Sequence, residues 1–165
     1  MNRTLYECQV LPANKTSQSL KRQYGKLRYE CFKKDDPNLV LDHVNELELD
    51  VFDEQSDTHY IMITARSKRD REPKLICAVR LLPTMQSYEL EQPSYRYLTE
   101  GVTLPKSPHI YESSRWVGRS SRTTAGKIAG GLLIMELTRT ARELGASQLI
   151  GVITTTTETF IEKRK

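Results

Sequence analysis

The 165-residue sequence lacks three features, and each absence excludes a class of protein. It has no uninterrupted apolar run of roughly 18 residues, the length of a membrane-spanning helix, and its first residues lack the apolar core of a secretory signal. Its three cysteines, Cys8, Cys31 and Cys77, are an odd number at wide spacing, which fits neither a disulfide framework nor a zinc knuckle. We therefore expect a cytoplasmic protein with buried thiols and no membrane partner.

Neither sign of charge dominates, and the histidines do not cluster. The 25 basic and 21 acidic residues leave a net charge of +4, and 38% of the residues are hydrophobic, as in globular rather than disordered chains. The length predicts a single domain over residues 1–165, with a core that needs no disulfides or metal. His43, His59 and His109 are dispersed, so we expect no metal site.

The charges are distributed unevenly along the chain. Residues 35–57 contain nine acidic and no basic residues, whereas residues 1–34 contain eight basic and two acidic ones. Such a block is usually a solvated loop or a charged face. The alternative is that some of its carboxylates line a binding site.

Hydrophobic periodicity predicts alternating strands and helices. Strands are expected over 4–11, 58–66, 74–82, 108–117 and 147–155, helices over 18–34 and 124–145, and a last helix through residue 165. The strands at 58–66 and 74–82 form a hairpin, and the acidic stretch 42–57 is irregular. This order favours an α+β fold, a three-layer sandwich with a mixed, largely antiparallel sheet.

Six charged side chains on different predicted elements are candidates for one site: Arg28, Asp50, Asp53, Arg80, Glu112 and Arg115. Arg80 shares a strand face with Ala78 and Leu82, where an isolated guanidinium would be too costly to bury. Taken singly, each arginine predicts only a surface salt bridge. Taken together, the six predict a buried ionic cluster that orients a small charged ligand.

The spacing of Glu112 and Arg115 does not fit a regular strand. Side chains alternate between the two faces, so residues three apart point to opposite faces. A bulge at Ser113–Ser114 would bring Glu112 and Arg115 to the same face.

Four segments carry a resemblance to a known family: residues 28–32 (RYECF), 48–53 (ELDVFD), 79–84 (VRLLPT) and 112–115 (ESSR). In this order and spacing they resemble the acyl-homoserine-lactone synthases, the LuxI-type autoinducer synthases of quorum sensing. The resemblance implies a fold similar to the GCN5-related N-acyltransferases, with S-adenosylmethionine and an acylated acyl carrier protein as substrates. In that family the amine of S-adenosylmethionine takes the acyl group, and lactone closure then expels methylthioadenosine. No cofactor is expected, because the sulfonium and the thioester are already activated.

The resemblance suggests catalytic roles for Glu112, Ser114 and Arg115. The attacking amine is protonated near neutral pH, so a carboxylate must remove its proton, directly or through a water. Glu112 is the candidate base, and a plain ion pair with Arg115 is the alternative. The predicted bulge would also free a backbone N–H near Ser114 to stabilise the thioester oxyanion.

S-adenosylmethionine carries a sulfonium, an ammonium and a carboxylate. Asp50 and Asp53 are expected to face its positive charge, and Phe32 to offer an aromatic ring to the cation. Arg28 or Arg80 would pair with its carboxylate. The alternative for Phe32 is a core aromatic on an amphipathic helix.

The sequence departs from the family pattern at Asn38, at Trp116, where many members have phenylalanine, and at its C-terminal end. Asn38 stands where the family often has tryptophan, and Trp116 is the candidate to supply the missing aromatic surface. Thr154 and Thr155 fall near the acyl-pocket threonine or serine of the family. The chain is also expected to lack the C-terminal segment of the family.

Acyl carrier proteins are acidic, so basic side chains near the thioester entrance are expected to dock one. The candidates are Arg119, Arg122, Lys127, Arg139 and Arg142. The alternative is a basic surface without a partner. Gly126, Gly130 and Gly131 fall short of a pyrophosphate-binding loop, which favours a carrier protein over acyl-coenzyme A as donor.

We expect the synthase to be a monomer. Two other functions remain open. One is a related N-acyltransferase that acylates another amine without lactonisation. The other is a basic nucleic-acid-binding module, suggested by the isoelectric point near 9.0. The acidic stretch argues against that second function, because it would repel phosphate.

Overall fold

The computed structural model describes residues 4–33, 41–66, 72–119 and 123–152. Five strands form one sheet in the order β1-β2-β3-β4-β5. They are β1 (Leu5–Pro12), β2 (His59–Arg66), β3 (Lys74–Pro83), β4 (Ile110–Gly118) and β5 (Gln148–Ile150). The first four pair antiparallel, and β5 pairs parallel to β4. The structure confirms the mixed, largely antiparallel sheet and the predicted hairpin.

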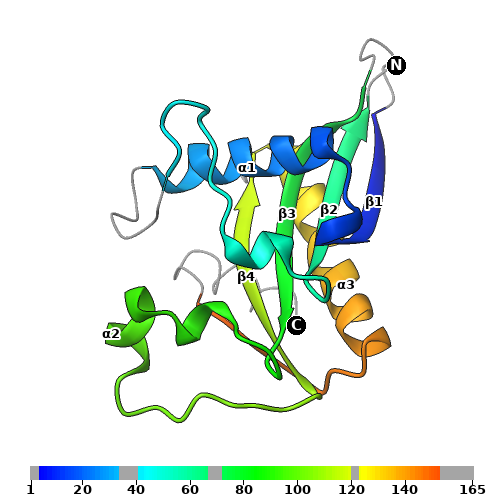
Figure 1. Cartoon of the computed structure of the whole chain (residues 1–165). Helices are drawn as coiled ribbons and strands as arrows, with labels where there is room; N and C mark the ends of the chain where they lie inside the picture. The colour runs from blue at the N-terminus through cyan, green and yellow to red at the C-terminus, as the bar shows by residue number, and fades with distance from the viewer. Residues whose placement is uncertain (1–3, 34–40, 67–71, 120–122, 153–165) are drawn as a thin grey trace.

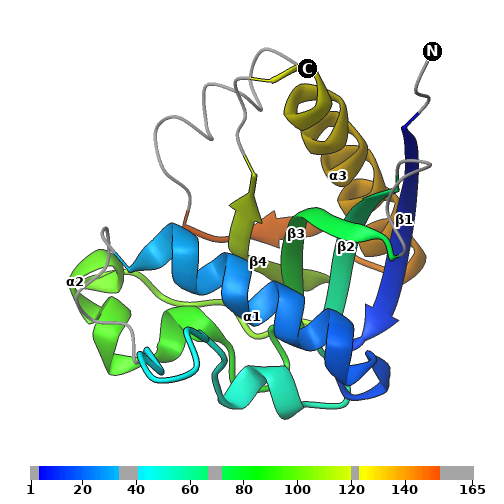
Figure 2. The same ribbon diagram turned by 90° about the horizontal axis from the view of Figure 1, so that it is seen from above.

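Two long helices cover the two faces of the sheet (Figures 1 and 2). Helix α1 (Gln18–Phe32) lies on one face and α3 (Thr124–Glu143) on the other. Strand alternation sends Tyr60 and Met62 into the core under α1, and Ile61 and Ile63 into the core under α3. The predicted three-layer sandwich is therefore confirmed.

The helices begin where side chains satisfy their first backbone N–H groups. The Ser17 hydroxyl accepts a hydrogen bond from the Leu20 N–H at the start of α1. The Thr123 hydroxyl accepts one from the Gly126 N–H at the start of α3. Each cap fixes the helix start and so the face that the helix turns to the sheet.

Short helical turns occupy the connections between these elements: η1 (Ala13–Lys15), η2 (Val51–Glu54), η3 (Glu89–Glu91), η4 (Pro93–Tyr95) and α2 (Arg96–Thr99). The turn η2 lies within the stretch predicted to be irregular. A third, smaller core of Phe52, Leu82, Tyr88 and Leu90 joins η2 and η3 to the end of β3. These turns bring the acidic segment (residues 42–57) and residues 88–95 together beside the end of β3.

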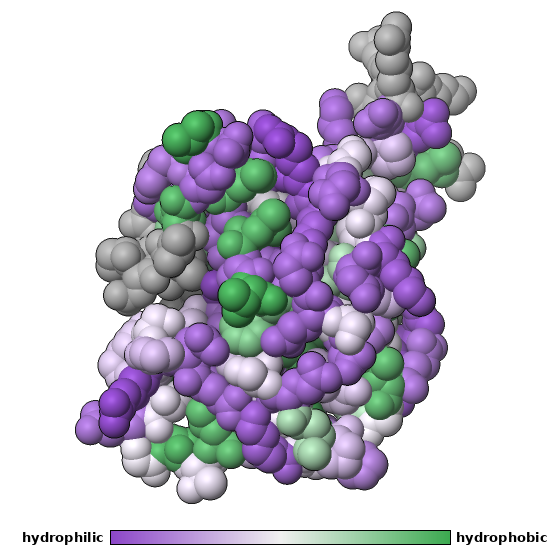
Figure 3. Space-filling view, in the orientation of Figure 1, coloured by the Kyte–Doolittle hydropathy of each residue, from purple (hydrophilic) through white to green (hydrophobic). Residues whose placement is uncertain are grey.

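The last predicted strand begins at residue 148, and its described part ends at Ile150. Its remainder and the predicted last helix fall outside the described residues. No helix among the described residues is long and apolar enough to cross a membrane. The face seen in Figure 3 is mostly hydrophilic, with small, separate hydrophobic spots rather than one broad apolar patch.

Candidate active site

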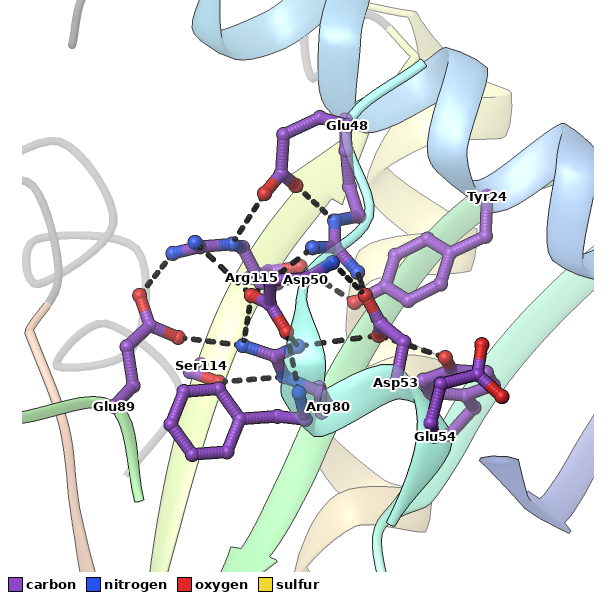
Figure 4. A network of polar contacts seen from close by, with 12 residues as sticks. Tyr24, Glu48, Asp50, Asp53, Glu54, Arg80, Glu89, Ser114 and Arg115 are labelled. Carbon is purple, nitrogen blue, oxygen red and sulfur yellow. Dashed lines mark hydrogen bonds and ion pairs between the residues drawn. The ribbon is translucent and has the colours of Figure 1, made fainter. Parts of the chain in front are cut away.

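Seven charged side chains meet between α1, the acidic segment and the sheet (Figure 4). This charged cluster consists of Arg28, Glu48, Asp50, Asp53, Arg80, Glu89 and Arg115. Glu48 and Asp53 are buried, so the acidic block is not simply a solvated face. The structure thus brings together five of the six predicted residues.

Arg28 reaches the cluster from α1 and is fully buried. Its Nη1 donates to both carboxylate oxygens of Asp53, at 2.8 and 2.9 Å, and its Nε donates to Glu48. Burial alone would lower the pKa of Arg28, but Asp53 and Glu48 outweigh it and raise that pKa above its ordinary value. A surface salt bridge is therefore the wrong interpretation of Arg28.

Asp53 is held as a charged carboxylate at the centre of the cluster. It also accepts hydrogen bonds from the Tyr60 hydroxyl at 2.7 Å and from the Asp50 N–H at 2.7 Å. Burial would raise the pKa of Asp53, yet Arg28 and Arg80 keep it well below its usual range. The Asp50 side chain in turn caps η2, so the ion pairs and the turn support each other.

Arg80 enters from β3 and is also fully buried. Its guanidinium bonds Asp50 at 2.5 and 2.9 Å and Glu89 at 2.8 Å, and its Nε donates to the Ser114 hydroxyl at 3.1 Å. The guanidinium carbon lies 5.3 Å from the centre of the Phe52 ring. The expectation that Arg80 needs acidic partners is confirmed.

Strand β4 has a bulge, but not where the sequence analysis placed it. Ser113 and Ser114 pair regularly with β3, and the register shifts across Arg115 and Trp116. The predicted position at Ser113–Ser114 is therefore wrong. The alternation rule shows that an extra residue is needed between Glu112 and the end of the strand, but it does not say which residue that is.

Arg115 takes the unusual backbone conformation of the bulge. Its φ of 53° lies in the left-handed region, which costs energy for a residue other than glycine. The Tyr24 hydroxyl bonds the Arg115 carbonyl at 2.9 Å, and the guanidinium bonds Glu48 at 3.2 Å, Asp50 at 3.2 Å and Glu89. These contacts offset the strain and keep Arg115 on the α1 face, beside Arg80.

Glu112 stands next to the cluster and is not ion-paired with Arg115. Its two oxygens accept hydrogen bonds from the backbone N–H groups of Glu89, at 2.7 Å, and Leu90, at 3.0 Å. Burial, helped by the charge of Glu89, raises the pKa of Glu112 to about 7. The ion-pair alternative is therefore wrong, and the carboxyl group titrates near neutral pH.

The two predicted aromatic residues have different positions. Phe32 is half-buried against the α1 core, and its ring centre lies 5.8 Å from the Arg115 guanidinium carbon, so it borders the cluster as well as the core. Trp116 packs with the residues under α3, and its Nε1 donates to the Ser113 hydroxyl at 3.3 Å. Trp116 therefore does not join the cluster, because the bulge turns Arg115 toward α1 and leaves Trp116 on the opposite face.

Comparison with known proteins identifies the family. The sequence matches the family model for autoinducer synthases over residues 13–164. It is 33% identical over 144 residues to an acyl-homoserine-lactone synthase of Acinetobacter nosocomialis, covering 83% of this chain and 74% of that protein. The chain belongs to the autoinducer synthases. As a member of this family it is an acyltransferase of the acyl-homoserine-lactone synthase class, as the four segments predicted.

Solved structures show that this autoinducer synthase shares the expected fold. The AHL synthase LasI superimposes with a TM-score of 0.77 at 21% identity, over 99% of this chain and 78% of that one. BjaI, a CoA-dependent synthase solved with SAM and isopentyl-CoA, gives 0.74 at 19% identity, over 96% and 71%. An acyl-CoA N-acyltransferase from Pseudomonas aeruginosa gives 0.61 at 16% identity, over 97% and 87%. The predicted similarity to N-acyltransferases is confirmed.

The predicted docking residues that the structure describes lie directly after β4 and along α3. Arg119 donates to the Leu75 carbonyl at 3.1 Å and approaches Glu30 at 3.6 Å. Lys127, Arg139 and Arg142 are exposed. Arg139 is paired with two acidic neighbours on its own helix, so part of its charge is already offset. Arg122, Thr154, Thr155 and Asn38 lie outside the described residues.

Sequence reasoning missed two carboxylates of the cluster. Glu48 lies within the segment 48–53, two positions before Asp50. In an extended chain, side chains two positions apart point the same way. That spacing could have identified it. Glu89 lies in a connection without hydrophobic periodicity, and no signal in the single sequence marks it.

Proposed function

We propose that this synthase transfers an acyl group to the amine of S-adenosylmethionine and then closes the lactone, releasing methylthioadenosine and a quorum-sensing signal. The observation that carries this proposal is the charged cluster, in which four carboxylates face three guanidinium groups. A site with more carboxylates than guanidinium groups suits a substrate with two positive groups and one negative group. The complex of BjaI with SAM supports the assignment.

Burial distinguishes the residues that can touch the substrate from those that act through others. The Asp50 side chain is 21% exposed, the most of any carboxylate in the cluster, so we assign it the direct contact with the substrate cation. We propose that Phe32, which borders the cluster near Arg115, offers its ring to the same cation. Arg28 and Arg80 are fully buried and saturated with carboxylates, so they position Asp50 and Asp53 rather than pair with the carboxylate of the substrate.

Glu112 is proposed to be the general base. A carboxyl group that titrates near pH 7 is suited to take a proton from an ammonium group at neutral pH. Both of its oxygens already accept backbone N–H bonds, so we propose that the proton reaches it through one water. The bulge leaves the extra residue at Arg115–Trp116 out of the ladder, and a backbone N–H there is our candidate for the thioester oxyanion, with Ser114 beside it.

The reaction can be tested with purified protein, S-adenosylmethionine and either an octanoyl carrier protein or octanoyl-coenzyme A. Mass spectrometry should detect the acyl lactone and methylthioadenosine in equal amounts, and Glu112→Gln should lower the rate of both by about 100-fold or more. An acylated amine without methylthioadenosine would favour the alternative N-acyltransferase. Full activity of Glu112→Gln would remove Glu112 from the mechanism.

The acyl donor can be assigned in the same assay. We propose an acyl carrier protein that docks on the basic residues of β4 and α3, among which Lys127 and Arg142 are exposed. Reversing both charges should raise KM for the carrier protein and leave KM for acyl-coenzyme A unchanged. A better rate with acyl-coenzyme A, or equal KM changes for both donors, would refute this docking surface.

A further inference from the structure

Glu89 is a member of the charged cluster that several neighbours hold in place. It lies at the start of η3, in the connection between β3 and β4, and it is buried. Its Oε2 accepts a hydrogen bond from Arg80 at 2.8 Å, and its Oε1 accepts bonds from Arg115 and from the Tyr95 hydroxyl. Burial alone would raise the pKa of Glu89, but the two arginines lower it below its ordinary value, so the carboxylate is charged.

Glu112 holds the backbone of Glu89 in place. Its carboxylate accepts the N–H groups of Glu89 and Leu90, two of the otherwise unpaired donors at the start of η3. Figure 4 shows the result: the Glu89 side chain enters the cluster from the side opposite Asp53, with the arginines between them. The proposed base, Glu112, is thus bonded directly to the backbone of the residue whose carboxylate faces Arg80 and Arg115.

Glu89 also decides the charge balance of the cluster. Without it, Arg28, Arg80 and Arg115 face three carboxylates and the cluster is neutral; with it, there is one excess negative charge. The nearby pair of Lys21 and Glu54, 2.7 Å apart, adds no net charge. Glu112, whose pKa burial raises to about 7, is only partly charged at neutral pH, whereas Glu89 is fully charged. Because the cluster is largely shielded from water, this excess charge acts on a ligand more strongly than a surface charge would.

We propose that Glu89 is a specificity-determining residue, which gives the site its excess negative charge and so selects the sulfonium substrate over an uncharged thioether of the same shape. This inference rests on the proposed function, because it assumes that S-adenosylmethionine binds at the cluster. S-adenosylmethionine carries a net charge of +1, whereas S-adenosylhomocysteine lacks only the sulfonium methyl group and its charge. The two ligands therefore isolate the effect of charge from that of shape.

The test is calorimetric titration of the wild-type chain and Glu89→Gln with both ligands. Glu89→Gln should weaken binding of S-adenosylmethionine about tenfold and change binding of S-adenosylhomocysteine less than about twofold. A residue that only supports the fold would weaken both ligands equally, and that result would overturn the inference. Glu91→Gln is the matched control, since Glu91 lies on the same turn but outside the cluster, paired with Lys106 at 2.7 Å, and it should leave both affinities unchanged.

Glu89→Asp keeps the charge with a shorter side chain, and it replaces Glu89→Gln in the titration if that variant does not fold. It should preserve the ratio of the two affinities, and loss of that ratio would overturn the inference. A wild-type chain that binds neither ligand would refute the proposed function itself. A wild-type preference for the sulfonium that persists in Glu89→Gln would refute only the role of Glu89.

Discussion

Replacing Arg28 by methionine tests whether the charged cluster is a buried network. The two side chains are unbranched near the backbone and similar in volume, so the change removes the charge and the hydrogen bonds more than it removes volume. Arg28 is fully buried, and its loss deprives Glu48 and Asp53 of donors inside the protein. Removing one partner of a buried ion pair costs about 3–5 kcal/mol. For a domain of this size, that corresponds to a fall in melting temperature of about 6–20 °C.

Urea unfolding followed by circular dichroism would measure this loss directly. Arg139→Met is the matched control, because Arg139 is exposed and solvent-exposed ion pairs such as those with Glu136 and Glu143 contribute little to stability. Adding Glu48→Gln to Arg28→Met should recover part of the loss, since it removes an uncompensated charge. If Arg28→Met costs no more than Arg139→Met, the cluster is not buried in solution and the reasoning fails.

Two further predictions concern Glu112 and the contact between β4 and β5. The pKa of Glu112 is raised to about 7, so the folded state binds this proton more tightly than the unfolded state does. Proton binding therefore stabilises the folded state by about 3 kcal/mol at low pH. This stabilisation should disappear as the pH rises through 7. Melting temperatures of Glu112→Gln should lack this decline between about pH 5 and pH 8, and a decline identical to wild type would contradict the pKa assignment. A Cβ at residue 151 would lie 2.4 Å from the Ser113 carbonyl oxygen, so Gly151→Ala should push β5 away from β4 and destabilise the protein by about 1–3 kcal/mol in urea unfolding. Unchanged stability would show that β5 has room to move.

Much of the fold could be predicted because its elements bury periodic apolar faces. The strands at 59–66 and 74–83 alternate between two cores, and the helix at 18–32 covers one of them. Arg80 could be assigned to a site for the same reason, because a charge on a buried strand face requires partners. At these positions, hydrophobic periodicity and the cost of burying a charge were sufficient to predict the structure.

Other features depend on contacts between distant segments, which a single sequence does not reveal. The bulge at Arg115 is supported by Tyr24, far away in sequence, which donates a hydrogen bond to the Arg115 carbonyl, and the bulge leaves Trp116 on the opposite face. The Glu89 backbone is held beside the cluster by Glu112, 23 positions further along the chain. Neither contact has a periodic or local signature.

The origin of the charges suggests how the site is held together. The three arginines come from α1, β3 and β4, which have their own hydrophobic cores, whereas the four carboxylates come from the irregular segment 48–53 and from η3. Ordering a backbone costs about 1–2 kcal/mol per residue, and these segments contribute only a small core around Phe52 and Tyr88. The ion pairs must therefore supply much of the order in the segments that form the site. In Arg28→Met, the rate of backbone amide hydrogen exchange should rise by a larger factor in residues 48–54 than in β2. Uniform acceleration across the sheet would mean instead that the arginines stabilise the whole domain and that the acidic segment is ordered without them.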